Sequence, residues 1–209
     1  MAEPGAGRRG RFIAFEGGEA SGKSTQARLL AEHLGAVLTR EPGGTHLGEA
    51  IRGLLLDPTQ TDMGDRAEAL LFAAARAQHV DEVIRPALDA GRHVVTDRFA
   101  GSSFAYQAFG RGLPLDEVRA LSRFAVDGVW PDLSILLVVA PDVAAERIGE
   151  PDRMEGVGPE FHQRVADGFD RLAATESGWV RIDASGDIDE VARSVRAAVA
   201  EHLDIELTP

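Results

Sequence analysis

Residues 17–24 read Gly-Gly-Glu-Ala-Ser-Gly-Lys-Ser, which matches the pattern GxxxxGK[ST] of a phosphate-binding loop. The apolar run 12–15 precedes the loop, and a helical pattern over 23–34 follows it. A strand, a glycine loop and a helix in this order direct backbone N–H groups and a helix N-terminus towards a phosphate chain. This stretch therefore predicts a nucleoside triphosphate site.

Four residues of the loop have a chemical role in such a site. A phosphate chain close to the backbone leaves no room for side chains, which explains Gly17 and Gly22. Lys23 supplies a positive charge for the β- and γ-phosphates, and the Ser24 hydroxyl can hold Mg²⁺. We therefore expect the triphosphate to bind together with Mg²⁺.

The rest of the chain alternates between short apolar runs and helical patterns. Strand-like runs occupy 12–15, 36–39, 93–96, 133–139 and 179–182, and helical patterns lie near 23–34, 45–56, 65–90, 115–127, 159–175 and 187–202. This alternation is typical of a parallel sheet with helices on both faces. We predict an α/β fold of three layers around a five-stranded parallel sheet, with a short lid.

Composition narrows the possible classes of protein. The 209 residues suit one domain, which we place at 11–209 after a flexible, Gly- and Arg-rich tail at 1–10 that lacks the apolar stretch of a signal peptide. No apolar run approaches the ~20 residues that span a membrane. The chain has no cysteine, which excludes disulfides and thiolate metal sites and fits a reducing cytoplasm. A net charge of −12 disfavours nucleic acid as a partner.

In folds of this kind the ligand binds outside the carboxyl ends of the strands. The second predicted strand leads into the turn 39–45, which contains Arg40 and Pro42. This turn is either a plain connection to the next helix or a backbone that faces a second anion. Arg52 lies on that helix, where it can point back towards the turn.

The third predicted strand ends in Asp97 and Arg98. An acid in this place can reach Mg²⁺ or its waters, and an arginine beside it can hold a phosphate with two hydrogen bonds. The alternative is a structural ion pair. The following segment, 101–107, offers small polar side chains to read a base edge and Tyr106 to crowd a sugar.

Two further features are ambiguous from the residues alone. Phe72 and Arg76 share a helix face, where they could form a stacking platform for a flat ring, although core packing is the commoner use of such a phenylalanine. The segment 148–158 is rich in Gly, Pro and charge and follows Arg147. It is either an exposed loop or a lid that brings an arginine to a phosphoryl-transfer site.

The order and spacing of these motifs closely resemble the thymidylate kinase family. The residues that carry the resemblance are 15–17 before the phosphate loop, 40–45, Phe72 with Arg76, 97–99, 106–107 and 152–153. It extends from about residue 11 to 203, and no single motif beyond the phosphate loop is specific. The resemblance implies transfer of the γ-phosphoryl group of ATP to dTMP with Mg²⁺, a step of dTTP biosynthesis, by a homodimer.

The resemblance also implies roles for individual residues. The catalytic residues would be Lys23, Arg98, Arg153 and Glu19, and the metal-linked residues Ser24 and Asp97. ATP would bind Gly17, Gly18, Glu19, Ala20, Ser21, Gly22, Lys23, Ser24 and Thr25, with Arg147 on the adenine. The acceptor dTMP would bind Glu19, Pro42, Arg52, Phe72, Arg76, Arg98, Ser102, Ser103, Tyr106 and Gln107.

Two departures from the family pattern affect the catalytic arginine. Some relatives carry a basic residue inside the phosphate loop, but position 20 is Ala here, and the lid has only Arg147 and Arg153. Arg153 is therefore the expected transition-state arginine.

The function of the whole chain has two competing interpretations, a phosphate-loop kinase with another acceptor and an ATPase that switches a protein partner. Phe72, Arg76, Ser103 and Tyr106 favour a pyrimidine deoxynucleotide.

Overall fold

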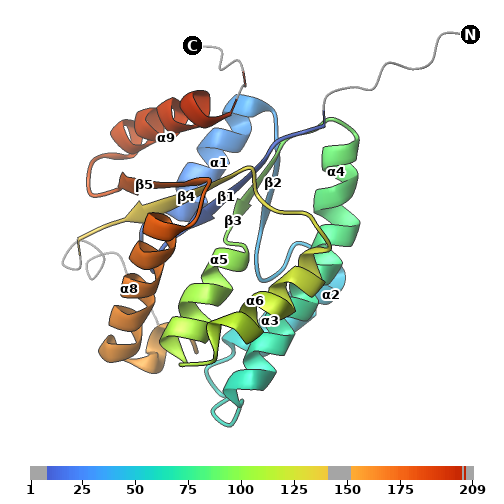
Figure 1. Ribbon diagram of the computed structural model, residues 1–209, viewed down its shortest axis with the longest axis vertical. Helices are drawn as coiled ribbons and strands as arrows, with labels where there is room; N and C mark the ends of the chain where they lie inside the picture. Colours follow the sequence, from blue (N-terminus) through green and yellow to red (C-terminus); the bar gives the residue numbers. More distant parts are fainter. Residues whose placement is uncertain (1–8, 141–151, 204, 206–209) are drawn as a thin grey trace, which may run out of the picture.

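The computed structural model describes residues 9–140, 152–203 and 205. Within these ranges strands and helices alternate along the chain (Figure 1). The elements are β1 (Phe12–Glu16), α1 (Lys23–Leu34), β2 (Val37–Arg40), α2 (His46–Leu56), α3 (Asp65–His79), η1 (Val80–Ile84), α4 (Arg85–Asp89), β3 (Val94–Asp97), α5 (Ala100–Ser103), η2 (Phe104–Gly110), α6 (Leu115–Val126), β4 (Leu133–Val138), η3 (Glu155–Val157), α8 (Pro159–Thr175), β5 (Trp179–Asp183) and α9 (Ile188–His202).

The strands form one sheet in the order β2-β3-β1-β4-β5, and every neighbouring pair is parallel. Side chains alternate between its two faces, as strand geometry requires. Phe12 and Ala14 of β1 join one buried cluster, whereas Ile13 and Phe15 join another. The central strands are therefore covered on both sides, which confirms the predicted three-layer α/β fold.

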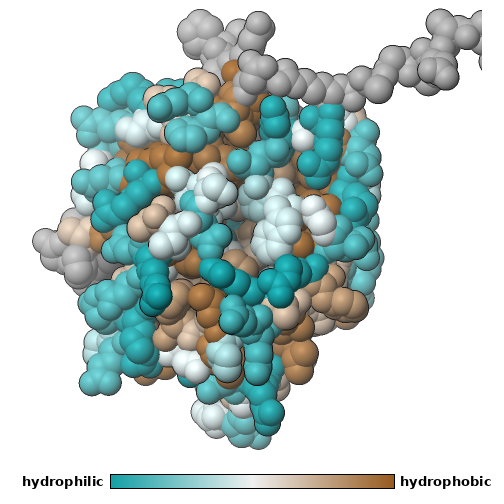
Figure 2. All heavy atoms as spheres, viewed as in Figure 1, coloured by the Kyte–Doolittle hydropathy of each residue, from teal (hydrophilic) through white to brown (hydrophobic). Residues whose placement is uncertain are grey.

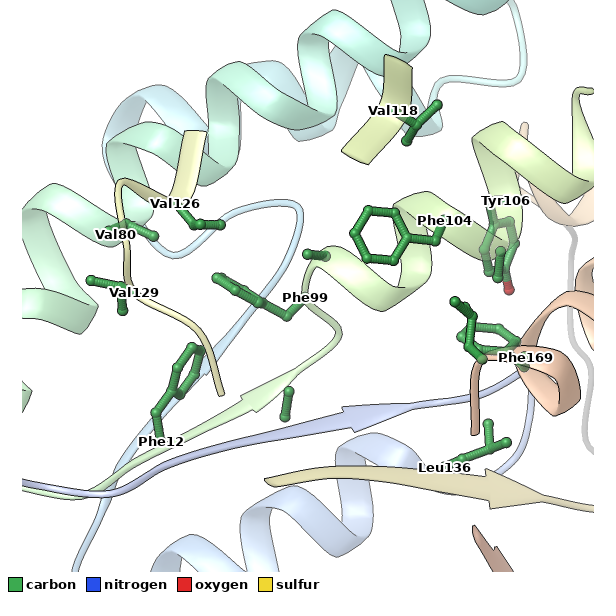
Figure 3. Packing of buried hydrophobic residues seen from close by; sticks show 14 of the residues in the cluster. Phe12, Val80, Phe99, Phe104, Tyr106, Val118, Val126, Val129, Leu136 and Phe169 are labelled. Carbon is green, nitrogen blue, oxygen red and sulfur yellow. The ribbon is translucent and has the colours of Figure 1, made fainter. Parts of the chain in front are cut away.

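Different helices supply the two outer layers. α1 and α9 pack against each other on one face, where the cluster includes Leu30 and Val195. α5, η2, α6 and α8 cover the other face (Figure 1). Figure 3 shows this second layer, in which the rings of Phe12 and Phe99 meet edge to face at 4.9 Å and Phe169 lies near Tyr106. The carboxyl ends of β1 and β3 then open onto the segments that carry the candidate site residues.

Two helical segments differ from the prediction. The region 65–90 is helical, but Val80–Ile84 is a π-helical turn rather than α-helix. It precedes Pro86, which lacks the N–H of a regular helical bond. The helical stretch over α5 and η2 was not predicted at all, because glycine, serines and aromatic residues obscure a helical pattern there.

The predicted tail and lid fall partly outside the described residues. Gly10, placed above in the tail 1–10, is buried and donates its N–H to the carbonyl of Leu88 at 3.0 Å. Of the lid 148–158, the structure describes 152–158, which includes η3. None of the described helices has both the length and the apolar character needed to cross a membrane.

Candidate active site

The phosphate loop connects β1 to α1 through backbone conformations that suit glycine. Gly17 has φ +142°, and a Cβ there would lie 2.4 Å from the carbonyl oxygen of Leu137. Gly22 caps α1 at φ +84°, so that the helix begins at Lys23. The amino end of α1 therefore faces the loop, the arrangement that binds a phosphate.

Lys23 is buried inside this loop. Its ammonium donates to the carbonyl of Gly18 at 2.5 Å and to the hydroxyl of Ser21 at 3.1 Å. Burial, reinforced by the nearby Arg98 guanidinium, lowers the pKa of Lys23 to about 8. A bound phosphate chain would favour the charged form, so this site gains from an anionic ligand.

Ser24 and Asp97 form a pair of oxygen ligands next to the loop. The Ser24 hydroxyl donates to Asp97 Oδ2 at 2.5 Å, and Asp97 ends β3 beside β1. The second carboxylate oxygen, Oδ1, is buried without a hydrogen-bond partner among the described residues. An unpaired carboxylate oxygen next to a hydroxyl fits a hard cation such as Mg²⁺.

Arg98 joins the phosphate loop to the opposite wall of the site. Its φ of +70° is unusual for a residue with a side chain. The guanidinium donates to the carbonyl of Gly17 at 2.9 Å, to Glu19 Oε1 at 2.7 Å and to Tyr106 Oη at 3.2 Å. The arginine is thus held by several partners in one orientation.

Glu19 receives two hydrogen bonds in this group. The Tyr106 hydroxyl donates to Glu19 Oε1 at 2.6 Å, beside the bond from Arg98. Burial by itself would raise the pKa of Glu19, but the charges of Arg98 and Lys23 outweigh it and lower the pKa to about 2. Glu19 is therefore ionised and fixes the direction of Arg98.

The second wall comes from the turn after β2 and from α2. Thr45 caps α2 by accepting the Gly48 N–H at 2.9 Å, and the peptide bond between Glu41 and Pro42 is cis. Arg52 donates from α2 to the carbonyl of Pro42 at 2.9 Å. The turn therefore connects β2 to α2 and also lines the cleft. That it faces a second anion stays a prediction.

Arg76 lies behind the cleft rather than in its lining. It is 1% exposed, its Nε donates to Glu41 at 2.8 Å, and its Nη2 donates to Ser103 at 3.0 Å. Phe72, one turn earlier on α3, is half-buried and does line the cleft. The two residues share a face as predicted, but of the pair only Phe72 reaches the surface of the cleft.

These segments enclose a cleft of about 830 Å³. Most of the predicted site residues line it, namely Glu19, Ala20, Ser21, Gly22, Lys23, Ser24, Thr25, Pro42, Arg52, Phe72, Asp97, Arg98, Ser102, Ser103, Tyr106 and Gln107. Gly17, Gly18, Arg76 and Arg153 are described but not in the lining, and Arg147 is outside the described residues. The other lining residues are Leu38, Thr39, Arg40, Glu41, Gly44, Glu49, Leu56, Val83, Asp152, Met154 and Glu155.

Arg153 is bound to α2 and α3 and does not line the cleft. Its Nε donates to the carbonyl of Leu55 at 2.6 Å, and its Nη2 pairs with Glu68 at 2.7 Å. Sequence reasoning missed Glu68, although a charged residue one turn before Phe72 in an apolar helix stripe is a usable signal. It named Glu16 only within the run 15–17 and gave it no role, whereas the structure shows a buried carboxyl that accepts hydrogen bonds from Phe99 N and from Ser102.

Comparison with known proteins agrees with this geometry. Residues 15–195 match the family model described as thymidylate kinase. The thymidylate kinase of Symbiobacterium thermophilum is 46% identical over 92% of this chain and 94% of its own length. That of Synechococcus sp. strain JA-3-3Ab is 48% identical over 92% of this chain and 96% of its own length.

A solved structure extends the similarity to three dimensions. The crystal structure of thymidylate kinase from Ehrlichia chaffeensis superposes with a TM-score of 0.76 at 34% identity. The match covers 92% of this chain and 99% of that structure. The phosphate loop, the cleft and these relatives together show that the chain belongs to the thymidylate kinase family, nucleoside monophosphate kinases that transfer the γ-phosphoryl group of ATP to dTMP.

Proposed function

We propose that this cleft performs the reaction of the family with ATP on the phosphate loop and dTMP against α2, α3 and α5–η2. The observation that carries the proposal is the contact between Arg98 and Glu19, because it ties an arginine of the acceptor wall to the donor loop. Phosphoryl transfer needs two anions aligned and their repulsion cancelled. The ion pair between Arg98 and Glu19 joins the phosphate loop to the arginines of the acceptor side, so the cleft can hold two anions next to each other.

On the donor side, the loop 17–25 and Lys23 hold the triphosphate. Ser24 and Asp97 would hold Mg²⁺, directly or through water, and the ion would neutralise charge on the β- and γ-phosphates. Among the described residues no group of three or more His, Cys, Asp or Glu is placed to hold a metal. This is in keeping with a Mg²⁺ site that relies on substrate phosphates for further ligands. The adenine contact assigned to Arg147 stays a prediction.

On the acceptor side, Arg98 and Arg52 hold the dTMP phosphate in line with the donor. Arginine suits this role because its planar guanidinium forms two parallel bonds to a phosphate. Glu19 keeps Arg98 oriented towards the loop. No general base is required, since the attacking phosphate oxygen is already ionised at neutral pH.

The thymine ring would stack on Phe72, with its edge towards Ser103. Arg76 acts on this contact indirectly, because its guanidinium donates to the Ser103 hydroxyl. Tyr106 would lie beside the sugar, and Pro42, Ser102 and Gln107 complete the wall. We assign no direct substrate contact to Arg153, because it does not line the cleft and its guanidinium is bound to Glu68 and Leu55.

We also propose a homodimer that associates through α2, α3 and α6. These helices pack against one another in sequence, α2 on α3 and α3 on α6. They expose large apolar side chains: Leu47, Leu54, Leu70 and Phe124, the last at 86% exposure. Such side chains favour burial against a partner.

We also propose a cytoplasmic location for the protein, because a chain without cysteine fits a reducing compartment.

The decisive experiment measures ADP formation from MgATP with dTMP, dUMP, dCMP, dGMP, thymidine or no acceptor. We expect a strong rate with dTMP, a weaker rate with dUMP and none with thymidine. A preference for another monophosphate would assign the chain a different acceptor. Equal slow turnover in every reaction would contradict the kinase function and favour an ATPase switch.

A further inference from the structure

The carboxylate of Glu68 lies at the junction of α3, η2 and the lid segment 152–155. The residue is 0% exposed. Arg153 Nη2 lies 2.7 Å from Glu68 Oε2, and Arg111 Nη2 lies 2.9 Å from the same oxygen. Gln107 Nε2 donates to the other oxygen at 2.9 Å. One buried carboxylate therefore binds three side chains from two other segments.

The lid segment is attached at a second place as well. The backbone N–H of Arg153 donates to the carbonyl of Leu56 at 3.2 Å, and its side chain Nε donates to the carbonyl of Leu55 at 2.6 Å. These two carbonyls lie in the last turn of α2. Carbonyls in the last turn of a helix have no hydrogen-bond partner within the helix. Arg153 thus connects the lid to α2 and, through Glu68, to α3.

Each of these attachments has a neighbour that lines the acceptor side of the cleft. Met154 follows Arg153 directly and lines the cleft, as do Leu56 and Gln107. Phe72 lies one turn along α3 from Glu68. The carboxylate is therefore at the back of the wall that faces the base and sugar.

The charges around Glu68 favour its ionised form. Burial alone would raise its pKa, but hydrogen bonds from Arg111, Gln107 and Arg153 lower it below the ordinary value for glutamate. Arg111 is held in turn over the ring of Phe161 at 4.8 Å. Removal of one partner from such a buried group leaves an uncompensated charge, so the group acts as a unit.

We propose that Glu68 is a positioning residue that holds the lid segment 152–155 and the Gln107 amide against the acceptor pocket. It acts through Arg153 and Gln107 and does not touch the substrates. Arg153 accordingly serves to anchor the lid, instead of contacting the transferring phosphoryl group as its sequence pattern suggested. This inference rests on the proposed function of the cleft.

The test is a double-mutant cycle with Glu68→Gln, Arg153→Met and the double variant. Glutamine keeps the size of the side chain but removes the charge, and methionine removes the lid half of the ion pair. kcat and the KM for dTMP and for MgATP are measured, together with thermal unfolding. Arg28→Met is the matched control, because Arg28 forms an exposed ion pair with Glu32.

We expect each single variant to raise the KM for dTMP about 10-fold and to change the KM for MgATP less. The double variant should not exceed the larger single effect, because both substitutions break the same contact. Arg28→Met should match the wild type. A merely structural ion pair would lower thermal stability and leave the KM for dTMP unchanged, which would overturn the inference.

Other outcomes distinguish an anchoring role of Arg153 from a direct role on the phosphates. A large loss of kcat in Arg153→Met alone, with wild-type kcat in Glu68→Gln, would show that Arg153 acts on the phosphates directly. If Glu68→Gln does not fold, Arg153→Met decides alone, since it leaves Glu68 paired with Arg111 and Gln107. A wild-type enzyme without dTMP-dependent activity would instead reject the proposed function.

Discussion

Glu16, the last residue of β1, is a buried carboxyl directly behind the acceptor wall. It is 1% exposed and accepts hydrogen bonds from Phe99 N at 3.1 Å and from Ser102 at 2.6 Å. Burial raises its pKa to about 7, although the bond from Ser102 and the charge of Arg98 act in the opposite direction. The folded protein therefore holds a proton that an unfolded chain would release near 4.5, the ordinary pKa of a glutamate side chain.

This proton makes stability depend on pH. Because the folded pKa is the higher one, the contribution of Glu16 is fully present below about pH 4.5 and is lost as the pH rises through 7. The difference amounts to roughly 3 kcal/mol at 1.36 kcal/mol per pKa unit. In Glu16→Gln this loss should be absent. Urea unfolding between pH 5 and 8 should therefore show a flatter profile for the variant, and parallel profiles would contradict the prediction.

Phe72 is the residue for which packing and binding must be separated, because it lines the cleft and also packs on the cluster of Ile51 and Leu55. Stacking of a base on an aromatic ring contributes about 1–3 kcal/mol. Phe72→Ala should therefore raise the KM for dTMP by about 5- to 150-fold with a smaller effect on kcat.

The matched control for this measurement is Leu71→Ala. Leu71 packs on the same cluster but does not line the cleft. The substitution Leu71→Ala should lower the melting temperature of the protein and leave the KM for dTMP unchanged. If both variants lose stability and neither changes the KM, Phe72 is a core residue only.

At the scale of elements, the stretch from α5 to η2 forms one side of the cleft assigned to the acceptor. It carries Ser102, Ser103, Tyr106 and Gln107. Its position is set by α8, which packs closely against η2. Close approach requires glycine on both sides: a Cβ on Gly168 would lie 2.7 Å from the Phe109 ring, and one on Gly110 would lie 2.6 Å from Phe161.

Gly168→Ala tests this contact between helices. Alanine favours a helix over glycine by about 1 kcal/mol, so helix propensity alone predicts stabilisation. Overpacking against Phe109 should prevail and destabilise the protein by about 1–3 kcal/mol, as measured by denaturant unfolding. The exposed neighbour serves as control, since Asp167→Ala should change stability by less than about 0.5 kcal/mol. A more stable Gly168→Ala would show that the packing adapts.

At the scale of the whole molecule, charge and apolar surface are distributed unevenly. The chain has 34 acidic and 22 basic residues, yet Lys23, Arg40, Arg52 and Arg98 all line one cleft. This gathering allows an acidic protein to bind two anionic substrates. Apolar residues also reach the surface among the hydrophilic ones on the face in Figure 2.

The proposed dimer predicts the effect of a charge on α3. Leu70 is 58% exposed, so Leu70→Arg should leave the fold intact and disrupt association. Light scattering should then give a mass near 22.3 kDa for the variant and twice that for the wild type. Ile188→Arg is the control, because Ile188 is equally exposed at 59% but lies on α9. A monomeric wild type would contradict the dimer.

The predictions from sequence succeeded where the signal is local. Strand bounds in β1, β2 and β3 agree to within a residue, because the apolar runs are short and are ended by turns. The phosphate loop is equally local, since its glycines and Lys23 are fixed by backbone conformation at consecutive positions. The helical stretch from α5 to η2 failed, because tertiary packing there overrides weak helix propensity.

The sequence by itself determined the layered parallel fold, the phosphate loop and the family, because periodicity and loop chemistry are properties of neighbouring residues. Only the tertiary structure decided which charged groups meet. It paired Arg76 with Glu41 and Arg153 with Glu68. Each pair joins segments far apart in the chain, and a buried charge is stable only beside a partner. The partner of each arginine therefore follows from the folded arrangement and not from the spacing of residues.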